Sequence, residues 1–131
     1  MVKLLTSFAS VATIGFGAWH FFVPMKWNWY KYIAPEATEL IVAVRAINVF
    51  FSLCMVLIGL ANIIFVYASR DRLTLIVMLS LSSILWASRC AMQIIYPQGS
   101  MNPWLQYGML IAFITILLCY VISLIHVLSI R

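Results

Sequence analysis

The chain has 131 residues, of which 66% are hydrophobic and only 8% are charged. Soluble domains carry about 25% charged residues, so these polar groups are too few to cover a soluble fold, and a soluble domain is excluded. The net charge of +5 comes without a basic run or a polar domain, which argues against a nucleic-acid partner. Because one crossing needs about 20 apolar residues, the chain has room for four transmembrane helices in a single domain, residues 1–131.

Residues 3–24 form the first expected span. An apolar run follows Lys3 and continues to Val23, well past the length of a signal-peptide core, and no small-x-small cleavage site follows it. We therefore expect this segment to be retained as a helix that closes at Pro24. Small and polar residues recur along it at steps of three and four, which places them on one helical face suited to close helix packing. They are Thr6, Ser10, Thr13, Gly17 and His20.

Residues 25–38 contain two tryptophans and two tyrosines beside Lys26 and Lys31. Amphipathic rings and lysines gather where a bilayer meets water. The composition therefore predicts an interfacial segment that is partly helical and turns at Ala34-Pro35.

Residues 39–68 form the second expected span, which Glu36 precedes and Glu39 begins. We expect the two carboxylates to be solvated charges that stabilise the helix N-terminus; in the alternative interpretation, one of them turns inward and pairs with a buried arginine. Small and polar residues at steps of three, four and seven share one face of this span, so that face meets a polar or close-packed partner. It carries Arg45, Asn48, Ser52, Gly59 and Asn62, of which the last two are expected to hold helices together.

A polar turn with Arg70 and Arg72 leads to the third span, residues 73–96, and a proline-flanked turn leads to the fourth, residues 104–130. Each carries a further stripe of small or polar residues. Stripes near a 3.5-residue period on every span predict an all-α integral membrane protein, a four-transmembrane antiparallel helix bundle. The stripes are Ser82, Trp86, Arg89, Gln93 and Tyr96 on the third span and Gly108, Ala112, Thr115, Cys119 and His126 on the fourth.

Loop charges predict the orientation of the bundle. The side with both termini carries Lys3, Arg70, Arg72 and Arg131, and the other side carries Lys26 and Lys31. The positive-inside rule then places both termini in the cytoplasm, across a bacterial inner or plasma membrane. The layout of four short spans resembles that of many small bacterial membrane proteins, including DoxX-like ones.

Three spans place polar groups at a similar depth. With about 1.5 Å of rise per residue, His20, Arg45 and Arg89 lie roughly 6–10 Å from the same membrane boundary. An arginine inside a span costs about 2.5–3.5 kcal/mol and generally faces the interior, where it finds a partner. We therefore predict a polar, cationic pocket in the outer half of the bilayer that binds or transports an anionic lipid-like or small-molecule ligand. Its residues are His20, Glu36, Glu39, Arg45, Asn48, Arg89 and Gln93.

Other interpretations of these residues stay open. Both arginines could serve the scaffold alone, by reaching outward or by binding backbone carbonyls. A membrane enzyme acting on a lipid or a quinone is a second function, although the chain has no recognisable nucleophile motif or phosphate-binding loop. An accessory subunit of a larger membrane complex is a third. The expected partners are membrane lipids, an anionic ligand, and a second copy or a partner membrane subunit.

The cysteines and histidines do not indicate a cofactor. Cys54, Cys90 and Cys119 lie in apolar segments without a CxxC or Cys/His spacing, so we expect them to pack as small apolar side chains. His126 lies about 33 Å along its helix from the start of the fourth span, which excludes a haem held by His20 and His126. We expect no metal ion and no cofactor.

Overall fold

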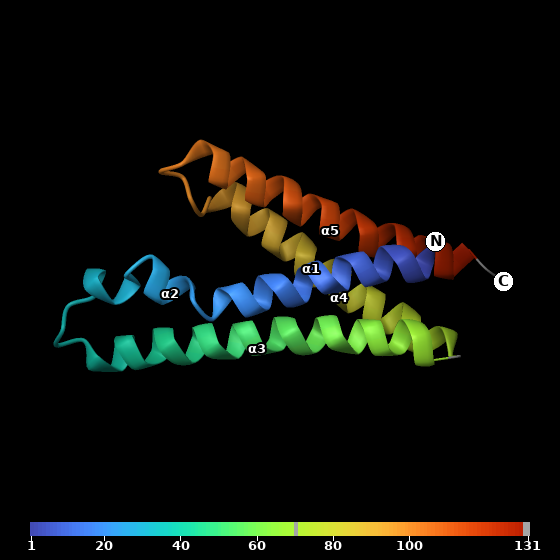
Figure 1. The fold of residues 1–131 in the computed structure, drawn as a ribbon, viewed down its shortest axis with the longest axis horizontal. Coiled ribbons are helices and arrows are strands. Elements are labelled where there is room, and N and C mark those ends of the chain that lie inside the picture. Colours follow the sequence, from blue (N-terminus) through green and yellow to red (C-terminus); the bar gives the residue numbers. More distant parts are fainter. Residues whose placement is uncertain (70, 130–131) are drawn as a thin grey trace.

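The protein is described by a computed structural model that covers residues 1–69 and 71–129. Its elements are α1 (Val2–His20), α2 (Val23–Lys26), the 3-10 helix η1 (Trp29–Tyr32), α3 (Thr38–Ala68), α4 (Arg72–Ile95) and α5 (Pro103–Ser129) (Figure 1). The described residues form no strand, and four of the helices are long and apolar enough to cross a membrane. The predictions that concern Arg70, Ile130 and Arg131 fall outside the described residues.

Among the described residues, the bounds of the four long helices lie within three residues of the expected spans except at the end of the first. α1 ends at His20, and Pro24 lies in the first turn of α2, where its missing N–H leaves no hydrogen bond unmade. The segment of residues 25–38 is partly helical, as predicted. The backbone N–H of Ala37 donates to the carbonyl of Ala34 at 2.9 Å and closes the expected turn.

α1 is the central helix of the bundle. It packs along α3 on one side and along α5 on the other, whereas α4 packs on α5 and touches α3 only lightly. Figure 1 shows that the α1–α3 pair and the α4–α5 pair diverge toward the end that carries α2, and that both termini lie at the opposite end. Asn62 joins the two pairs by donating from Nδ2 to Ser82 Oγ at 2.8 Å, which confirms its expected role between helices.

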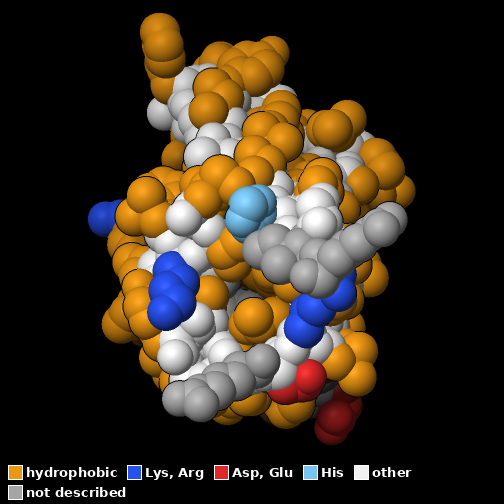
Figure 2. Space-filling view, turned by 90° about the vertical axis from the view of Figure 1, so that its right-hand side faces the viewer, with side chains coloured by type: hydrophobic (Ala, Val, Ile, Leu, Met, Phe, Trp, Pro, Cys, Tyr) orange, Lys and Arg blue, Asp and Glu red, His pale blue; other side chains and the backbone are white. Residues whose placement is uncertain are grey.

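Polar side chains close the end of the bundle that carries the termini. Asp71 is the N-cap of α4 and accepts hydrogen bonds from the hydroxyl of Thr74 and from the backbone N–H groups of Leu73 and Thr74. These donors, the hydroxyl first, hold the pKa of the Asp71 carboxyl below its ordinary value. Arg72 donates to two carbonyls in the last turn of α5, at 3.1 and 2.7 Å. Figure 2 shows this end, where lysine, arginine and histidine side chains lie among hydrophobic ones.

Two glycines let α1 and α3 approach each other closely. A Cβ at Gly17 would lie 2.8 Å from the carbonyl oxygen of Ser52, and a Cβ at Gly59 would lie 2.9 Å from the carbonyl oxygen of Ser10. A methyl group at either position would therefore collide with the backbone of the facing helix. The small-residue stripes predicted for these two spans are thus the surfaces along which the backbones meet.

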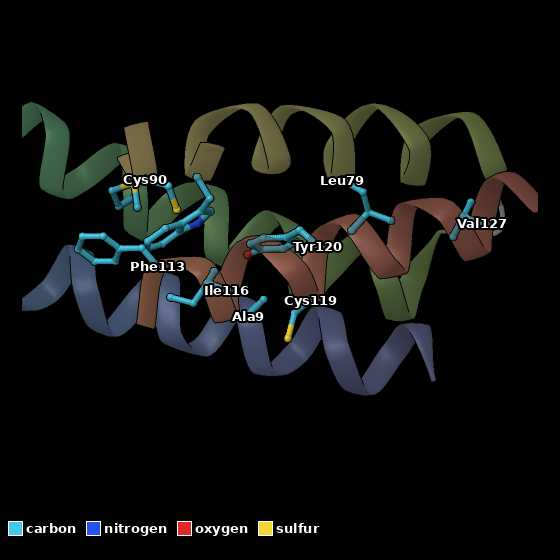
Figure 3. Packing of buried hydrophobic residues seen from close by; sticks show 10 residues of the cluster. Ala9, Leu79, Cys90, Phe113, Ile116, Cys119, Tyr120 and Val127 are labelled. Atoms are coloured by element: carbon cyan, nitrogen blue, oxygen red, sulfur yellow. The ribbon is translucent and has the colours of Figure 1, made fainter. Parts of the chain in front are cut away.

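A network of buried hydroxyl and indole groups joins α1, α4 and α5. The hydroxyl of Tyr120 lies 3.2 Å from Ser10 Oγ and 3.2 Å from Thr13 Oγ1, and Trp86 Nε1 donates to Thr13 Oγ1 at 3.1 Å. All four side chains are fully buried. Figure 3 shows Tyr120 in the middle of the core, between Phe113 toward one end and Val127 toward the other. Each polar group of the network has a partner on another helix, which an apolar interior requires.

The stripes predicted for α1 and α4 are largely buried, but the one predicted for α5 is only partly so. Cys119 is buried, whereas Thr115 is exposed. Thr115 donates to the carbonyl of Ile111 at 2.8 Å and so satisfies its hydroxyl within its own helix, which allows it to face outward. The inward face of α5 carries Phe113, Ile116, Cys119, Tyr120, Ser123 and Val127.

The contact between α1 and α3 predicts different effects for two nearby glycines. Gly17→Ala should lower the free energy of unfolding by about 1–3 kcal/mol, because the added methyl group forces the backbones apart. Gly15→Ala is the matched control on the same helix, since a Cβ there meets no atom within 4 Å. It should be neutral or stabilise the helix by up to roughly 1 kcal/mol. Unfolding in mixed micelles measures both, and equal effects would contradict the packing.

The network predicts a cost for removing one hydroxyl. Tyr120→Phe keeps the ring and deletes the hydroxyl that serves Ser10 and Thr13, so the free energy of unfolding should fall by roughly 0.6 to 1.7 kcal/mol. Tyr107→Phe, at an exposed tyrosine of the same helix, should leave stability unchanged. The same micellar unfolding assay measures both variants.

Candidate functional site

A cavity of about 530 Å³ lies where the two helix pairs diverge. Its walls come from the last turns of α1, the α2–η1 segment, the turn between α4 and α5, and the first half of α5. The volume falls within the roughly 300–1,000 Å³ typical of small-molecule sites. The lining is predominantly aromatic and includes Phe16, Trp19, Trp27, Trp29, Trp104 and Phe113.

Large rings and small residues together create the hollow. Phe16 and Phe113 meet edge to face at 5.2 Å between ring centroids, and both contact Trp86, at 5.6 and 5.5 Å. These rings separate the cavity from the hydroxyl network. On the opposite wall, Gly108 and Ala112 lie one turn apart on α5, and a Cβ at Gly108 would meet no atom within 4 Å. Small residues here leave open space instead of admitting another helix.

Two left-handed residues shape the loops of the cavity. Asn28, with φ of 50°, lies between Trp27 and Trp29 and is the N-cap of η1, and both indoles line the cavity. Asparagine tolerates this conformation better than most residues. Gly99, with φ of 76°, turns the chain between α4 and α5, and a side chain there would press on Leu105.

His20 ends α1 and is held by Asn48 of α3. Asn48 is buried; its Nδ2 donates to the His20 carbonyl at 3.1 Å, and its Oδ1 lies 2.9 Å from His20 Nδ1. Because Oδ1 can only accept, Nδ1 is the donor in this contact. His20 and Trp29 line the main cavity and also a second cavity of about 200 Å³ beside α3. The histidine is thus a fixed polar group in an apolar wall.

Arg89 lies behind the aromatic wall and reaches the cavity through Gln98. Its guanidinium carbon lies 4.5 Å from the ring centroid of Phe113 and 5.8 Å from that of Phe16. Arg89 Nη2 donates to Gln98 Oε1 at 2.6 Å, and Gln98 lines the cavity. The cation is therefore half-buried against two π-faces, a favourable arrangement for guanidinium.

Gln93 lies one helical turn after Arg89 on α4 and holds the loop between α4 and α5 that carries Gln98. It is 2% exposed, and its Nε2 donates to the backbone carbonyl of Gln98 at 2.9 Å. Its Oε1 is buried without a hydrogen-bond partner. An unpaired amide oxygen of this kind is unusual in a folded protein and marks a place where a donor group would be stabilised.

The structure brings four of the predicted site residues together and separates the other three from them. His20 and Asn48 form one hydrogen-bonded pair, and Arg89 and Gln93 converge on Gln98. Arg45 is instead exposed, with its guanidinium 5.4 Å from the ring centroid of Tyr30 in η1. Glu36 and Glu39 are also exposed. Within residues 1–69 and 71–129, no carboxylate forms an ion pair with an arginine, so the inward-turned glutamate is not found.

The position of Arg45 follows from the length of α1. Asn48 faces His20, the last residue of that helix, so Arg45 lies about one turn beyond its end, where only η1 is opposite. The depth estimated from the sequence was similar for both arginines, but Arg45 has no helix against which to bury. It lines neither of the two cavities.

The sequence prediction missed most of the cavity lining. The tryptophans of residues 25–38 were assigned to the membrane interface alone. Two spacings could have indicated the cavity: Phe16 lies four residues before His20, and Trp104, Gly108 and Ala112 follow one another at four-residue steps. Both sets share a helical face, and all five residues line the cavity.

Comparisons of the chain with protein-family models, curated proteins and solved structures found no match. Within the described part of the chain, no three His, Cys, Asp or Glu side chains are placed to hold a metal ion. The cavity and the residues around it are thus the basis for a functional assignment.

The pairing of His20 with Asn48 predicts a specific defect. Asn48→Ala removes both hydrogen bonds and leaves the last carbonyl of α1 unpaired, so the free energy of unfolding should fall by about 1–2 kcal/mol. The imidazole NMR signals of His20 should also change, because Nδ1 loses its acceptor. Asn62→Ala is the control: it deletes another interhelical hydrogen bond and should lower stability without affecting those signals. Unchanged His20 signals in Asn48→Ala would contradict the assigned hydrogen bond.

Proposed function

We propose that this protein is an integral membrane protein, an antiparallel four-helix bundle that binds a lipid-like amphiphile in its aromatic cavity. The observation that carries the proposal is the cavity of about 530 Å³ walled by four tryptophans and two phenylalanines at one end of the bundle. Tryptophan is enriched where a membrane meets water, so an amphiphile would enter a cavity at this level from the lipid itself.

The outer surface of the bundle supports insertion in a membrane. Large apolar side chains are exposed along every long helix, including Leu4, Phe50, Ile84 and Ile111, each more than 60% exposed. Exposed apolar surface of this extent is stable only in contact with lipid or another protein. The contacts of α1 with α3 run in opposite chain directions, from Ser10 with Gly59 to Gly17 with Ser52, which favours the antiparallel arrangement.

The charges favour one orientation. The end with the termini carries Lys3 and Arg72, with Arg70 and Arg131 nearby in the sequence, and the segment at the cavity end carries Lys26 and Lys31. The positive-inside rule places the termini in the cytoplasm of a bacterial cell and the cavity in the outer half of the bilayer. This assignment is part of the proposal.

An amphiphile fits the chemistry of the cavity wall. Its apolar part would remove water from indole and phenyl surfaces at about 25 cal/mol per Å² of buried area. A polar group on the same molecule would meet His20, Gln98 or an indole N–H of the lining tryptophans. A fully polar metabolite would gain little from this lining.

Binding is better supported than transport or catalysis. The Phe16, Trp86 and Phe113 rings close the cavity toward the other end of the bundle, so a path across the membrane would need these rings to move. Among the described residues, His20 is the one ionisable side chain in the lining, which leaves an enzyme acting on a lipid or quinone without a second acid-base group. An accessory subunit would keep the same cavity, and a second copy or larger partner would cover the outer helix faces.

Filling the cavity tests the proposal. Gly108→Leu places an isobutyl group in open space inside the cavity, and Gly15→Leu is the matched control at a glycine that is equally open but lies outside it. The probe is a dibrominated eighteen-carbon alcohol, which quenches tryptophan fluorescence on contact, added to the purified protein in uncharged micelles.

Wild-type protein and Gly15→Leu should show the same saturable quenching, whereas Gly108→Leu should bind at least about tenfold more weakly, a difference of roughly 1.4 kcal/mol. Quenching that is linear in probe concentration, as simple partitioning into the micelle gives, would contradict the proposal. Equal binding by both leucine variants would contradict it too.

A further inference from the structure

Arg89 is a half-buried cation that forms no ion pair within residues 1–69 and 71–129. Its one hydrogen bond among the described residues goes to the neutral amide oxygen of Gln98, although a guanidinium has five N–H donors. The chain has three acidic residues. Asp71 lies at the other end of α4 and caps that helix, while Glu36 and Glu39 are exposed on the loop before α3 and its first turn. None of them reaches Arg89.

A cation in this position gains from a negative partner. A charge that is buried loses its hydration energy, and an opposite charge with hydrogen bonds can offset this loss. The two phenyl faces beside Arg89 offset only part of it. The carbonyl-type oxygen of Gln98 has the position of a carboxylate oxygen but carries no charge. The contact between Arg89 and Gln98 therefore has the geometry of an arginine–carboxylate pair but lacks the negative charge.

Gln98 is well placed to be exchanged for a ligand. It is exposed, it lines the cavity, and its side chain has one hydrogen bond, the one to Arg89. Its backbone is held separately, because Gln93 donates to its carbonyl. The side chain can thus swing away from Arg89 while the turn keeps its shape.

We infer that the bound amphiphile is an acid whose carboxylate or phosphate oxygen displaces Gln98 Oε1 from Arg89, with its apolar part in the aromatic cavity. This inference rests on the proposed function, since it assumes that the cavity holds an amphiphile. Gln98 occupies the anion position when the cavity is empty. Arg45 takes no part, because it lies on the exposed face of α3.

The experiment compares probes that differ only in the head group: dibrominated eighteen-carbon fatty acid, alcohol and monoalkyl phosphate. Binding is measured by tryptophan quenching in uncharged micelles, at a pH where the acids are ionised. Wild-type protein should bind at least one acidic probe about tenfold or more tightly than the alcohol, as expected for a charge-assisted bond in a partly buried site. A preference for the carboxylate indicates a fatty acid, and a preference for the phosphate indicates a phospholipid-like ligand.

Substitutions on both sides of the bond identify the anion site. Arg89→Gln should remove the preference and keep alcohol binding. Arg45→Gln makes the same change in net charge and should keep the preference, which controls for general attraction by a basic protein. Gln98→Glu should pair internally with Arg89 and lower the ratio of acid to alcohol affinity by about tenfold, whereas Gln98→Ala should raise that ratio. Because Gln98 is exposed, these two variants test the site even if Arg89→Gln fails to fold.

The outcomes separate this inference from the proposed function. Equal affinity of wild-type protein for acid and alcohol would overturn the inference while the cavity proposal stands. So would a preference that survives Arg89→Gln, or an unchanged ratio of acid to alcohol affinity in Gln98→Glu. Absence of saturable binding by every probe in folded wild-type protein would overturn both.

Discussion

The arrangement of the bundle depends on the hydrogen bonds that Tyr120, Thr13 and Trp86 form across three helices. In an apolar environment no water replaces a missing partner, so each buried hydroxyl needs an acceptor or donor from protein. Rotating α1, α4 or α5 about its axis would leave at least one of these groups unpaired. The close approach of α1 to α3 at Gly17 and Gly59 adds a second, purely steric constraint. Together the two constraints hold α1 at the centre.

The cavity forms because α1 ends at a level where α3 and α5 continue. α1 ends at His20, but α3 begins well before Asn48, which faces that histidine, and α5 begins well before Phe113, which faces Phe16. Beyond this level the α2–η1 segment occupies the place of a helix, and it supplies tryptophans instead of a packed helical face. The small residues on α5 keep the remaining space open, so an aromatic hollow forms above a tightly hydrogen-bonded core.

The two arginines show how surroundings decide the role of a side chain. Arg89 lies within the length of α1 and α5, so two phenyl rings and Gln98 surround it. Arg45 lies past the end of α1 and contacts Tyr30 at the surface. Arg89 thus lies near a cavity and has no carboxylate partner within residues 1–69 and 71–129, whereas Arg45 is exposed at the surface, where a charge costs little.

The sequence by itself determined the four apolar helices and the inward faces of α1 and most of α4, because hydropathy and helical spacing are local properties of the chain. It also identified Arg89, Gln93, His20 and Asn48 as polar residues in need of partners. The tertiary structure decided which face of α5 turns inward, since Thr115 can satisfy its hydroxyl within its own helix while Tyr120 finds partners on α1. It also decided that the two arginines separate and that tryptophans distant in sequence line one cavity. These features depend on the register between helices and on where α1 ends relative to its neighbours, which local periodicity does not specify.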